Sequence, residues 1–346
     1  MDELMHSELR KKLYLIESER VAAIINGSSV QEIETALNTN GEEIMEDVTN
    51  KLIHSVRAVI KLVSPIYFSS EFLNHLISAD SSSLGNPISE KEFCAARDFV
   101  ESCLKANLSK VQWLHLENQF RSNAEGFCIS HRDEEHFIFT QDDPFGVKST
   151  DLLVHELGHA ADHTVSRSRN DDSLLIRHIT LCEAVAYYCQ YQYLSEFGTQ
   201  AKRHGSLGPL CFLYLCIATV RYCLKKNLPL SDFDPEVDID DSEFNEIIDS
   251  YNKCGINGRE YICSILNESV KPCGSLTNLV FNQIAPKFGI VLAILLLDCE
   301  SDLMIELINE NTVETDIYSI LHKFIPDYYI QINSFETLAL KYINNA

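Results

Sequence analysis

Two histidines and a glutamate form the most distinctive chemical pattern of this chain. His155, Glu156 and His159 follow an H-E-x-x-H spacing. Residues four apart on a helix lie on the same face, so both imidazoles can bind one metal ion while Glu156 stays beside it. This arrangement predicts a zinc site at which Glu156 accepts the proton of a zinc-bound water.

The segment from Asp151 to His163 is predicted to form the helix that carries this pattern. Ser149, Thr150 and Asp151 are candidate N-caps ahead of an apolar run. A glycine in a helix interior costs about 1 kcal/mol relative to alanine. We therefore expect another backbone or a ligand to approach Gly158 closely.

A zinc site of this kind needs a third protein ligand. His163 lies another turn along the helix, too far from a tetrahedral centre set by the first two histidines. Glu183 is the better candidate, because it lies in an apolar run from Ser173 to Tyr191 that predicts a second helix ending at Gly198. His178, earlier in the same run, is the alternative ligand.

The pattern resembles that of the gluzincin metallopeptidases, whose zinc is held by the two motif histidines and a glutamate of the next helix. The resemblance covers residues 130–195. It implies that His155, His159 and Glu183 bind one zinc ion per chain and that Glu156 is the general base. It also implies a zincin-like core in which a strand ahead of the motif helix binds the substrate backbone.

Two positions separate this chain from related patterns. Val165 stands where the metzincin pattern needs a third histidine. Tyr187 stands where several gluzincin families have the Asp or Asn that orients the first histidine, and Asp162 could take over that task. The segments typical of the thermolysin and aminopeptidase branches do not occur.

Hydrolysis at such a site also needs a group that stabilises the oxyanion. Tyr187, Tyr191 and His204 are the candidates, and the sequence does not choose among them. Together with Glu156, Tyr187 and His204 complete the predicted catalytic residues.

Two short runs rich in β-forming residues precede the motif helix. Gly126–Ser130 and His136–Thr140 are separated by a polar segment and predict a hairpin or two adjoining strands. His136–Thr140 is the candidate for an open sheet edge that could bind a peptide by strand addition. An ordinary strand inside the sheet is the alternative.

The remaining periodicity is mainly helical and predicts a mostly α-helical α+β fold. We expect an N-terminal helical lobe over 1–125, a zincin-like core with a small sheet over 126–200, and a C-terminal helical lobe over 201–346, joined as one compact unit. Helices are predicted over 3–25, 29–37, 42–63, 90–106 and 207–224, with a loop over 81–87 and a buried apolar run over 288–297.

Composition excludes some functions and favours a reducing compartment. The 346 residues carry a formal charge of −23, which argues against a nucleic-acid partner. Twelve cysteines are scattered without a C-x-x-C pair, no signal peptide opens the chain, and the longest apolar stretches are too short to cross a bilayer. We expect a cytoplasmic protein without a membrane span, and delivery into a host cell stays open.

The acidic tract 232–243 lacks the glycine that an EF-hand turn requires, so it predicts a surface loop rather than a calcium site. The general acidity would favour cationic substrates, or it would only keep the protein soluble.

The expected function is zinc-dependent hydrolysis of a peptide bond in a peptide or protein substrate. Two alternatives stay open: a zinc hydrolase acting on a non-peptide amide or ester, and a binding protein whose H-E-x-x-H motif has no function.

Overall fold

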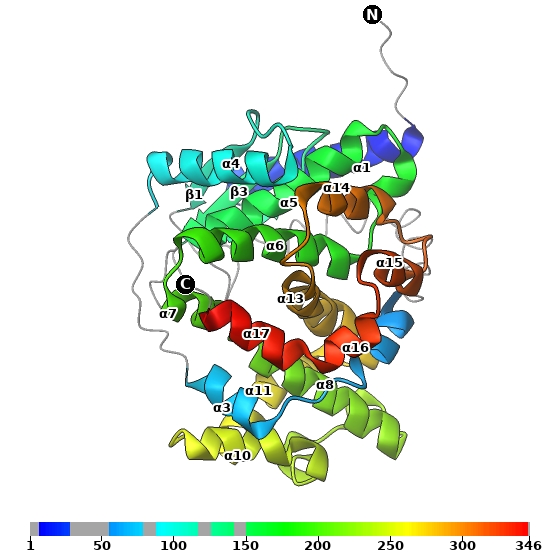
Figure 1. The fold of residues 1–346 in the computed structure, drawn as a ribbon. Helices are drawn as coiled ribbons and strands as arrows, with labels where there is room; N and C mark the ends of the chain where they lie inside the picture. The colour runs from blue at the N-terminus through cyan, green and yellow to red at the C-terminus, as the bar shows by residue number, and fades with distance from the viewer. Residues whose placement is uncertain (1–6, 28–54, 79–87, 117–125, 142–149, 345–346) are drawn as a thin grey trace, which may run out of the picture.

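The described part of the protein is mostly helical, with a small sheet. A computed structural model describes residues 7–27, 55–78, 88–116, 126–141 and 150–344 (Figure 1). The longer helices are α1 (Glu8–Ile25), α3 (Ser70–Ile77), α4 (Glu90–Leu104), α5 (Thr150–Ser168), α6 (Ile179–Phe197), α7 (Gln200–Ser206), α8 (Pro209–Lys226), α10 (Asn245–Lys253), α11 (Gly258–Ile265), α13 (Ala285–Leu295), α14 (Ser301–Glu310), α15 (Ile317–Phe324), α16 (Tyr328–Asn333) and α17 (Phe335–Asn344).

Short helical segments connect several of these helices. They are η1 (Asp172–Leu175), η2 (Leu230–Asp232), α9 (Pro235–Asp238), η3 (Ser242–Phe244), η4 (Leu266–Val270), η5 (Lys271–Cys273), α12 (Leu276–Leu279) and η6 (Val280–Ile284). The predicted acidic surface loop falls among these turns, at η2, α9 and η3.

The sheet has three strands in the order β1-β3-β2: β1 (Gln112–Leu116), β2 (Gly126–Ile129) and β3 (Phe137–Gln141). The predicted hairpin is confirmed, because β2 pairs antiparallel with β3, with Phe127 opposite Phe139. The predicted sheet edge is wrong. A strand that the sequence did not predict, β1, pairs parallel with β3 and makes β3 central. Among the described residues, β2 is the strand beside the motif helix that has one unpaired edge.

Alternating side chains of the sheet pack into two different hydrophobic clusters. Phe127 and Phe139 pack with Val21 and Ile24 of α1 on one face. Ile138 points the other way and joins the main hydrophobic cluster with Leu157 of α5. Because successive strand residues face opposite sides, α1 and α5 cover opposite faces of the sheet.

A buried ion pair ties α1 to the end of α5. The Arg167 guanidinium donates to both carboxylate oxygens of Glu17, at 2.6 and 3.0 Å. The same carboxylate accepts hydrogen bonds from the Ser130 hydroxyl at 2.8 Å and the Arg132 backbone N–H at 3.0 Å. Glu17 therefore has donors for both oxygens, which is what a buried carboxylate requires.

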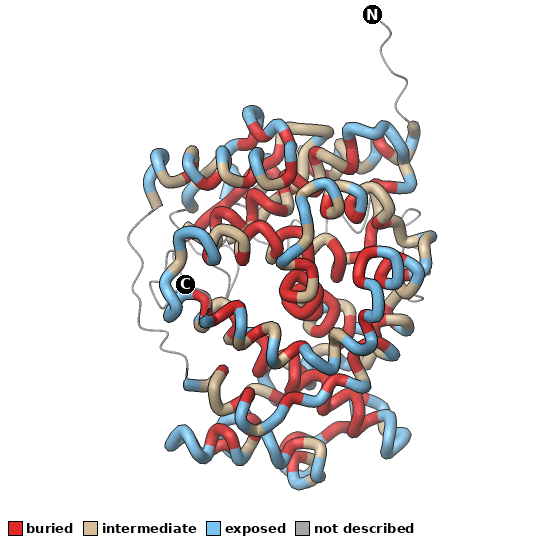
Figure 2. The backbone as a smooth tube through the Cα atoms, in the orientation of Figure 1, coloured by how far each residue is buried: buried red, intermediate tan, exposed pale blue. Residues whose placement is uncertain are grey.

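The main hydrophobic core runs without interruption through all three predicted lobes. It extends from Val56 to Ile343 and includes residues of α4, α5, α6, α8 and α13. Figure 2 shows the buried residues concentrated in the middle of the molecule. The predicted buried run 288–297 is confirmed from Phe288 to Ile294, where every residue of α13 is buried, whereas Leu295 and Leu297 are only partly buried. In Figure 1, α13 lies directly beneath α6, along which it packs.

The helix predicted from Ser173 is interrupted. The turn η1 ends at Leu175, and Ile176 and His178 have extended backbones with ψ of 116° and 114° before α6 begins. The break lets Arg177 and His178 reach buried partners on other segments, as described below. Predicted helices 3–25, 90–106 and 207–224 correspond to α1, α4 and α8. The predicted helix 29–37, most of 42–63 and the loop 81–87 lie outside the described residues.

All twelve cysteines are described, and all are free thiols. By length and composition alone, Gln200–Lys226 and Leu276–Leu295 could each cross a membrane. Within their most apolar windows, 78% and 61% of the residues are buried in the fold, as in core helices.

Candidate metal centre

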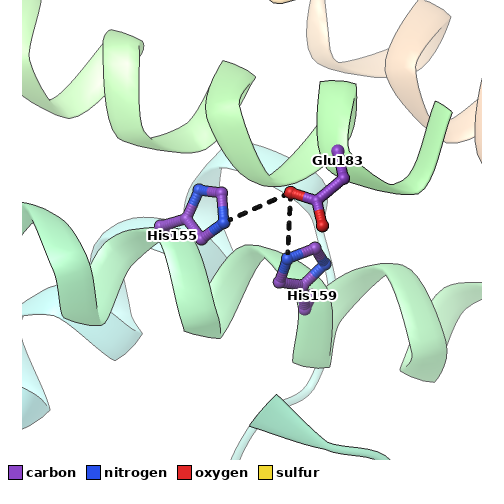
Figure 3. A group of neighbouring side chains, drawn as sticks. All are labelled: His155, His159 and Glu183. Carbon is purple, nitrogen blue, oxygen red and sulfur yellow. Dashed lines mark ion pairs between the residues drawn. The ribbon is translucent and has the colours of Figure 1, made fainter. Parts of the chain in front are cut away.

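Three potential metal ligands meet between α5 and α6. His155 and His159 come from α5 and Glu183 from α6 (Figure 3). Glu183 Oε2 lies 3.5 Å from His155 Nε2 and 3.6 Å from His159 Nε2. The three ligand atoms all lie within 4.8 Å of one another. The structure thus brings together the three residues that the sequence proposed as ligands.

Glycines allow the helices that carry these residues to approach closely. A Cβ added to Gly158 would lie 2.8 Å from the Cα of Ala186, so the close backbone approach predicted at Gly158 is confirmed. A Cβ added to Gly289 of α13 would lie 2.6 Å from the Cβ of Glu183. Helix α6 therefore packs closely against both α5 and α13, each of which contributes a glycine.

The charges of the cluster favour a bound cation. Burial raises the pKa of Glu183, but His159 and His155 outweigh it and leave the pKa well below its ordinary value. Burial lowers the pKa of His159, but the Glu183 carboxylate outweighs it and raises that pKa to about 9. Two imidazole nitrogens and one carboxylate oxygen are a donor set that zinc accepts in catalytic sites. The residues present therefore fit zinc.

Glu156 lies next to the cluster and contacts the sheet. It is only 6% exposed, and burial is the main cause that raises the pKa of its carboxyl. The carboxylate also accepts a hydrogen bond from the backbone N–H of Cys128. Because Cys128 belongs to β2, the acid of the motif meets one of the two edge strands of the sheet that the described residues form.

Asp162 does not take over the orientation of His155. Its carboxylate forms a buried ion pair with Arg177, which also contacts His163 Nδ1 at 3.1 Å. His155 Nδ1 is buried and has no hydrogen-bond partner in the described part of the chain. The ring of Tyr187 lies against His155 instead, with 4.4 Å between ring centroids.

His178, the alternative ligand, is engaged elsewhere. Its Nδ1 lies 2.6 Å from the Ser55 hydroxyl and its Nε2 lies 2.8 Å from the Thr315 carbonyl oxygen. Its backbone N–H donates to Asn311 at 2.9 Å. Both ring nitrogens therefore have partners away from the cluster, and His178 does not join it.

Of the three candidate oxyanion donors, one lies at the cluster. Burial raises the pKa of the Tyr187 hydroxyl, and the nearby carboxylates of Glu183 and Glu156 raise it further. Tyr191 is fully buried, and its hydroxyl lies 3.4 Å from the Ser206 carbonyl oxygen.

His204 is also placed elsewhere. It stacks on His75 with 4.3 Å between ring centroids, and its Nε2 lies 2.7 Å from the His75 carbonyl oxygen. We therefore retain Tyr187 and set aside His204, which the sequence suggested as a catalytic residue, together with Tyr191.

Three contributors to the site were not found from the sequence: the Cys128 amide, the Arg177 guanidinium and Gly289. The signal for Gly289 was present, since a glycine inside a long buried apolar run often marks a close helix contact. The Cys128 amide could not be found from the sequence, because every residue except proline has a backbone N–H.

Comparison of the chain with protein families, curated proteins and solved structures finds no match. The functional argument therefore rests on the geometry of the site.

Proposed function

We propose that this protein is a zinc-dependent peptidase with a zincin-like core. The observation that carries the proposal is the convergence of His155 Nε2 and His159 Nε2 on one carboxylate oxygen of Glu183. Glu156 follows His155 on the same helix. Its carboxylate is not one of the three proposed metal ligands and is therefore available as a base. This combination of three ligands and one separate acid serves hydrolysis.

His155, His159 and Glu183 would hold the metal. When bound there, zinc supplies a Lewis acid that lowers the pKa of water and polarises a carbonyl group. Glu156 accepts a proton from the attacking water and passes it to the leaving amine. Burial raises the pKa of Glu156, so its carboxylate accepts the proton of the water more readily than an exposed carboxylate would.

A peptide is the substrate that the surroundings of Glu156 favour. In the described part of the chain, no strand pairs with the second edge of β2. An unpaired edge offers backbone N–H and C=O groups to an extended chain. Since the Cys128 N–H on this strand reaches Glu156, a peptide added along β2 would pass beside the general base. A non-peptide amide or ester would have no use for such an edge.

Tyr187 is the proposed oxyanion donor. Its ring packs on His155, and burial together with both carboxylates of the site raises the pKa of its hydroxyl and keeps it protonated. A protonated phenol can donate a hydrogen bond to charge that develops on the substrate oxygen.

Two measurements test this proposal. Metal analysis of the purified protein should find about one zinc ion per chain, whereas a binding protein with a non-functional motif would contain far less. Glu156→Gln should keep the zinc and lose turnover of a peptide library by about 100-fold or more. Wild-type turnover in Glu156→Gln would overturn the assigned mechanism, and turnover of esters without peptides would favour the non-peptide hydrolase.

A further inference from the structure

His163 is a third histidine of α5 at the spacing of the two proposed ligands. It follows His159 by four residues and His155 by eight, so the three rings lie along one side of the helix. Within the described stretch from Leu153 to Thr164, only these three histidines are partly exposed, and every other residue is buried. The open side of α5 is therefore a line of three imidazoles, of which the metal centre uses two.

The tautomer of His163 is fixed by Arg177. A guanidinium nitrogen of Arg177 lies 3.1 Å from His163 Nδ1. Because arginine has N–H donors and no acceptor, Nδ1 must accept this hydrogen bond with its lone pair, and the ring proton must be on Nε2. Arg177 is held in turn by its buried ion pair with Asp162. Burial and the charges of Arg177 and Arg167 also lower the pKa of His163 well below its ordinary value. His163 is thus a neutral imidazole with one N–H donor.

The Nε2–H of His163 is available to a bound molecule. Among the described residues, none forms a hydrogen bond with it. It is also not sealed in the core, unlike His155 Nδ1, which is buried without a partner. The nearby ring of His136 cannot accept from it, because both nitrogens of that ring are engaged by the His131 backbone N–H and the Thr164 hydroxyl.

Strand β2 and the turn after it run alongside α5 in the same direction. A Cβ on Gly126 would lie 3.4 Å from Cδ2 of Leu152. Beyond the end of the strand, the Arg132 carbonyl oxygen accepts a hydrogen bond from Arg167. At a rotation of about 100° per residue, His163 is turned only about 20° from Leu152 and about 40° from Arg167 around the helix axis. His163 therefore faces the side of α5 along which β2 runs.

A peptide bound by strand addition to β2 would run along this line of histidines. Among the described residues, one edge of β2 has no partner strand. One helical turn, about 6 Å, separates His159 from His163, and an extended chain advances about 3.3 Å per residue. When the cleaved bond lies at the metal ligands, a backbone carbonyl group about two residues away is level with His163.

We propose that His163 binds the substrate backbone by donating its Nε2–H to a peptide carbonyl oxygen about two residues from the cleaved bond. This inference rests on the proposed peptidase function. A neutral N–H donor suits a backbone carbonyl, which every peptide sequence provides, so the contact does not select a side chain. It fixes the register of the peptide, and hence which bond lies at the metal centre.

The experiment pairs a change in the protein with the removal of one peptide carbonyl. The probe is a labelled peptide that the wild-type protein cleaves, titrated by fluorescence anisotropy into zinc-loaded Glu156→Gln protein. In a series of analogues, one peptide bond at a time on either side of the cleaved bond is replaced by an (E)-alkene, which keeps the extended shape but has no carbonyl oxygen. Each analogue is also titrated into Glu156→Gln protein that carries His163→Phe.

At one position about two residues from the cleaved bond, the alkene should weaken binding about fivefold more in the protein with His163 than in His163→Phe. The alkene also removes an N–H, but this loss is the same in both proteins and cancels. His163→Gln keeps an N–H donor near the position of Nε2 and should retain part of the effect. His322→Phe is the matched control, because it replaces an exposed histidine of α15, and it should leave the effect unchanged.

A second readout follows the tautomer of His163 without a peptide. In protein labelled with 15N-histidine, NMR should show a proton on Nε2 of His163 and none on Nδ1. The signals of His163 are identified by their loss in His163→Phe.

Four results would overturn the inference: no position at which the alkene weakens binding in the protein with His163, an equal alkene effect in His163→Phe, an equal loss of the effect in His322→Phe, or a His163 ring with its proton on Nδ1. Failure of the peptidase proposal would show separately, as zinc-free protein or as a peptide library in which nothing is cleaved, and this inference would fall with it. A cleaved peptide without an effect of His163 would overturn this inference alone.

Discussion

The Cα of Ala186 faces Gly158 so closely that a Cβ on residue 158 would lie 2.8 Å away from it. Helices α5 and α6 therefore meet backbone to backbone at the level of the metal ligands. Close contact of this kind holds the two histidines of one helix opposite the glutamate of the other.

Gly158→Ala should destabilise the protein and weaken zinc binding. Alanine improves helix propensity by about 1 kcal/mol, but the clash is with backbone atoms that cannot rotate away. We expect a net loss of about 1–2 kcal/mol in the free energy of unfolding, measured by urea denaturation. Gly205→Ala is the control, because a Cβ there would meet no atom within 4 Å. Equal stability of the two variants would contradict the role assigned to the contact.

Zinc affinity should depend on pH through His159. In the metal-free protein its pKa is raised from 6.5 to about 9, because Glu183 outweighs burial. A protonated imidazole cannot bind zinc, so affinity should rise by up to about tenfold per pH unit and level off above about pH 9. Competition with a chelator at several pH values measures this. Affinity independent of pH between about 7 and 9 would exclude a proton on His159.

The same pKa shift predicts the stability of the metal-free protein. Pairing of protonated His159 with Glu183 stabilises the fold fully below about pH 6.5, the ordinary pKa. This contribution is lost as pH rises through about 9, where the folded protein releases the proton. The Tm of metal-free protein should therefore fall across this window more than the Tm of a metal-free His159→Gln variant.

Glu183→Ala and His178→Ala should separate metal binding from stability. Removing Glu183 leaves two ligands, so zinc affinity should fall by at least about 100-fold. His178→Ala leaves the Ser55 hydroxyl and the Thr315 carbonyl without their partner, which should cost about 1–3 kcal/mol of stability. It should nevertheless bind zinc normally. Zinc loss in His178→Ala at a temperature where the variant is folded would argue for a different ligand set.

Two tyrosines one helical turn apart provide a test of the oxyanion donor. Tyr187→Phe should keep zinc and lower kcat by about 100-fold, because one hydrogen bond to the developing charge is removed. Tyr191→Phe should leave kcat almost unchanged, since the Tyr191 hydroxyl lies near the Ser206 carbonyl. A comparable loss in both variants would indicate an effect through packing of the two rings, whose centroids are 5.7 Å apart.

The sequence predicted the parts of the site that depend on local spacing. His155 and His159 share a helix face because they are four residues apart. Gly158 indicated a close contact, because a glycine destabilises the interior of a helix. Glu183 was found because an acid in an apolar helix needs a partner. Each of these signals lies within one helix.

The features that the sequence did not predict depend on contacts between distant segments. Strand β1 pairs with β3 rather than with β2, the next strand in the sequence. No local pattern of residues specifies this strand order, which leaves one edge of β2 unpaired among the described residues. The helix break before α6 is another case. Arg177 and His178 leave the helix because their partners, Asp162 and Asn311, lie on other elements.

The contact between Glu183 and Gly289 has a consequence for synthesis of the protein. Both histidines and Glu183 leave the ribosome well before α13 is made. A nascent chain that ends before α13 thus has all three ligands but lacks the helix that packs against Glu183. Translation beyond Gly289 completes the wall of the site, so a stalled or truncated chain carries the motif without the support that holds its third ligand in place.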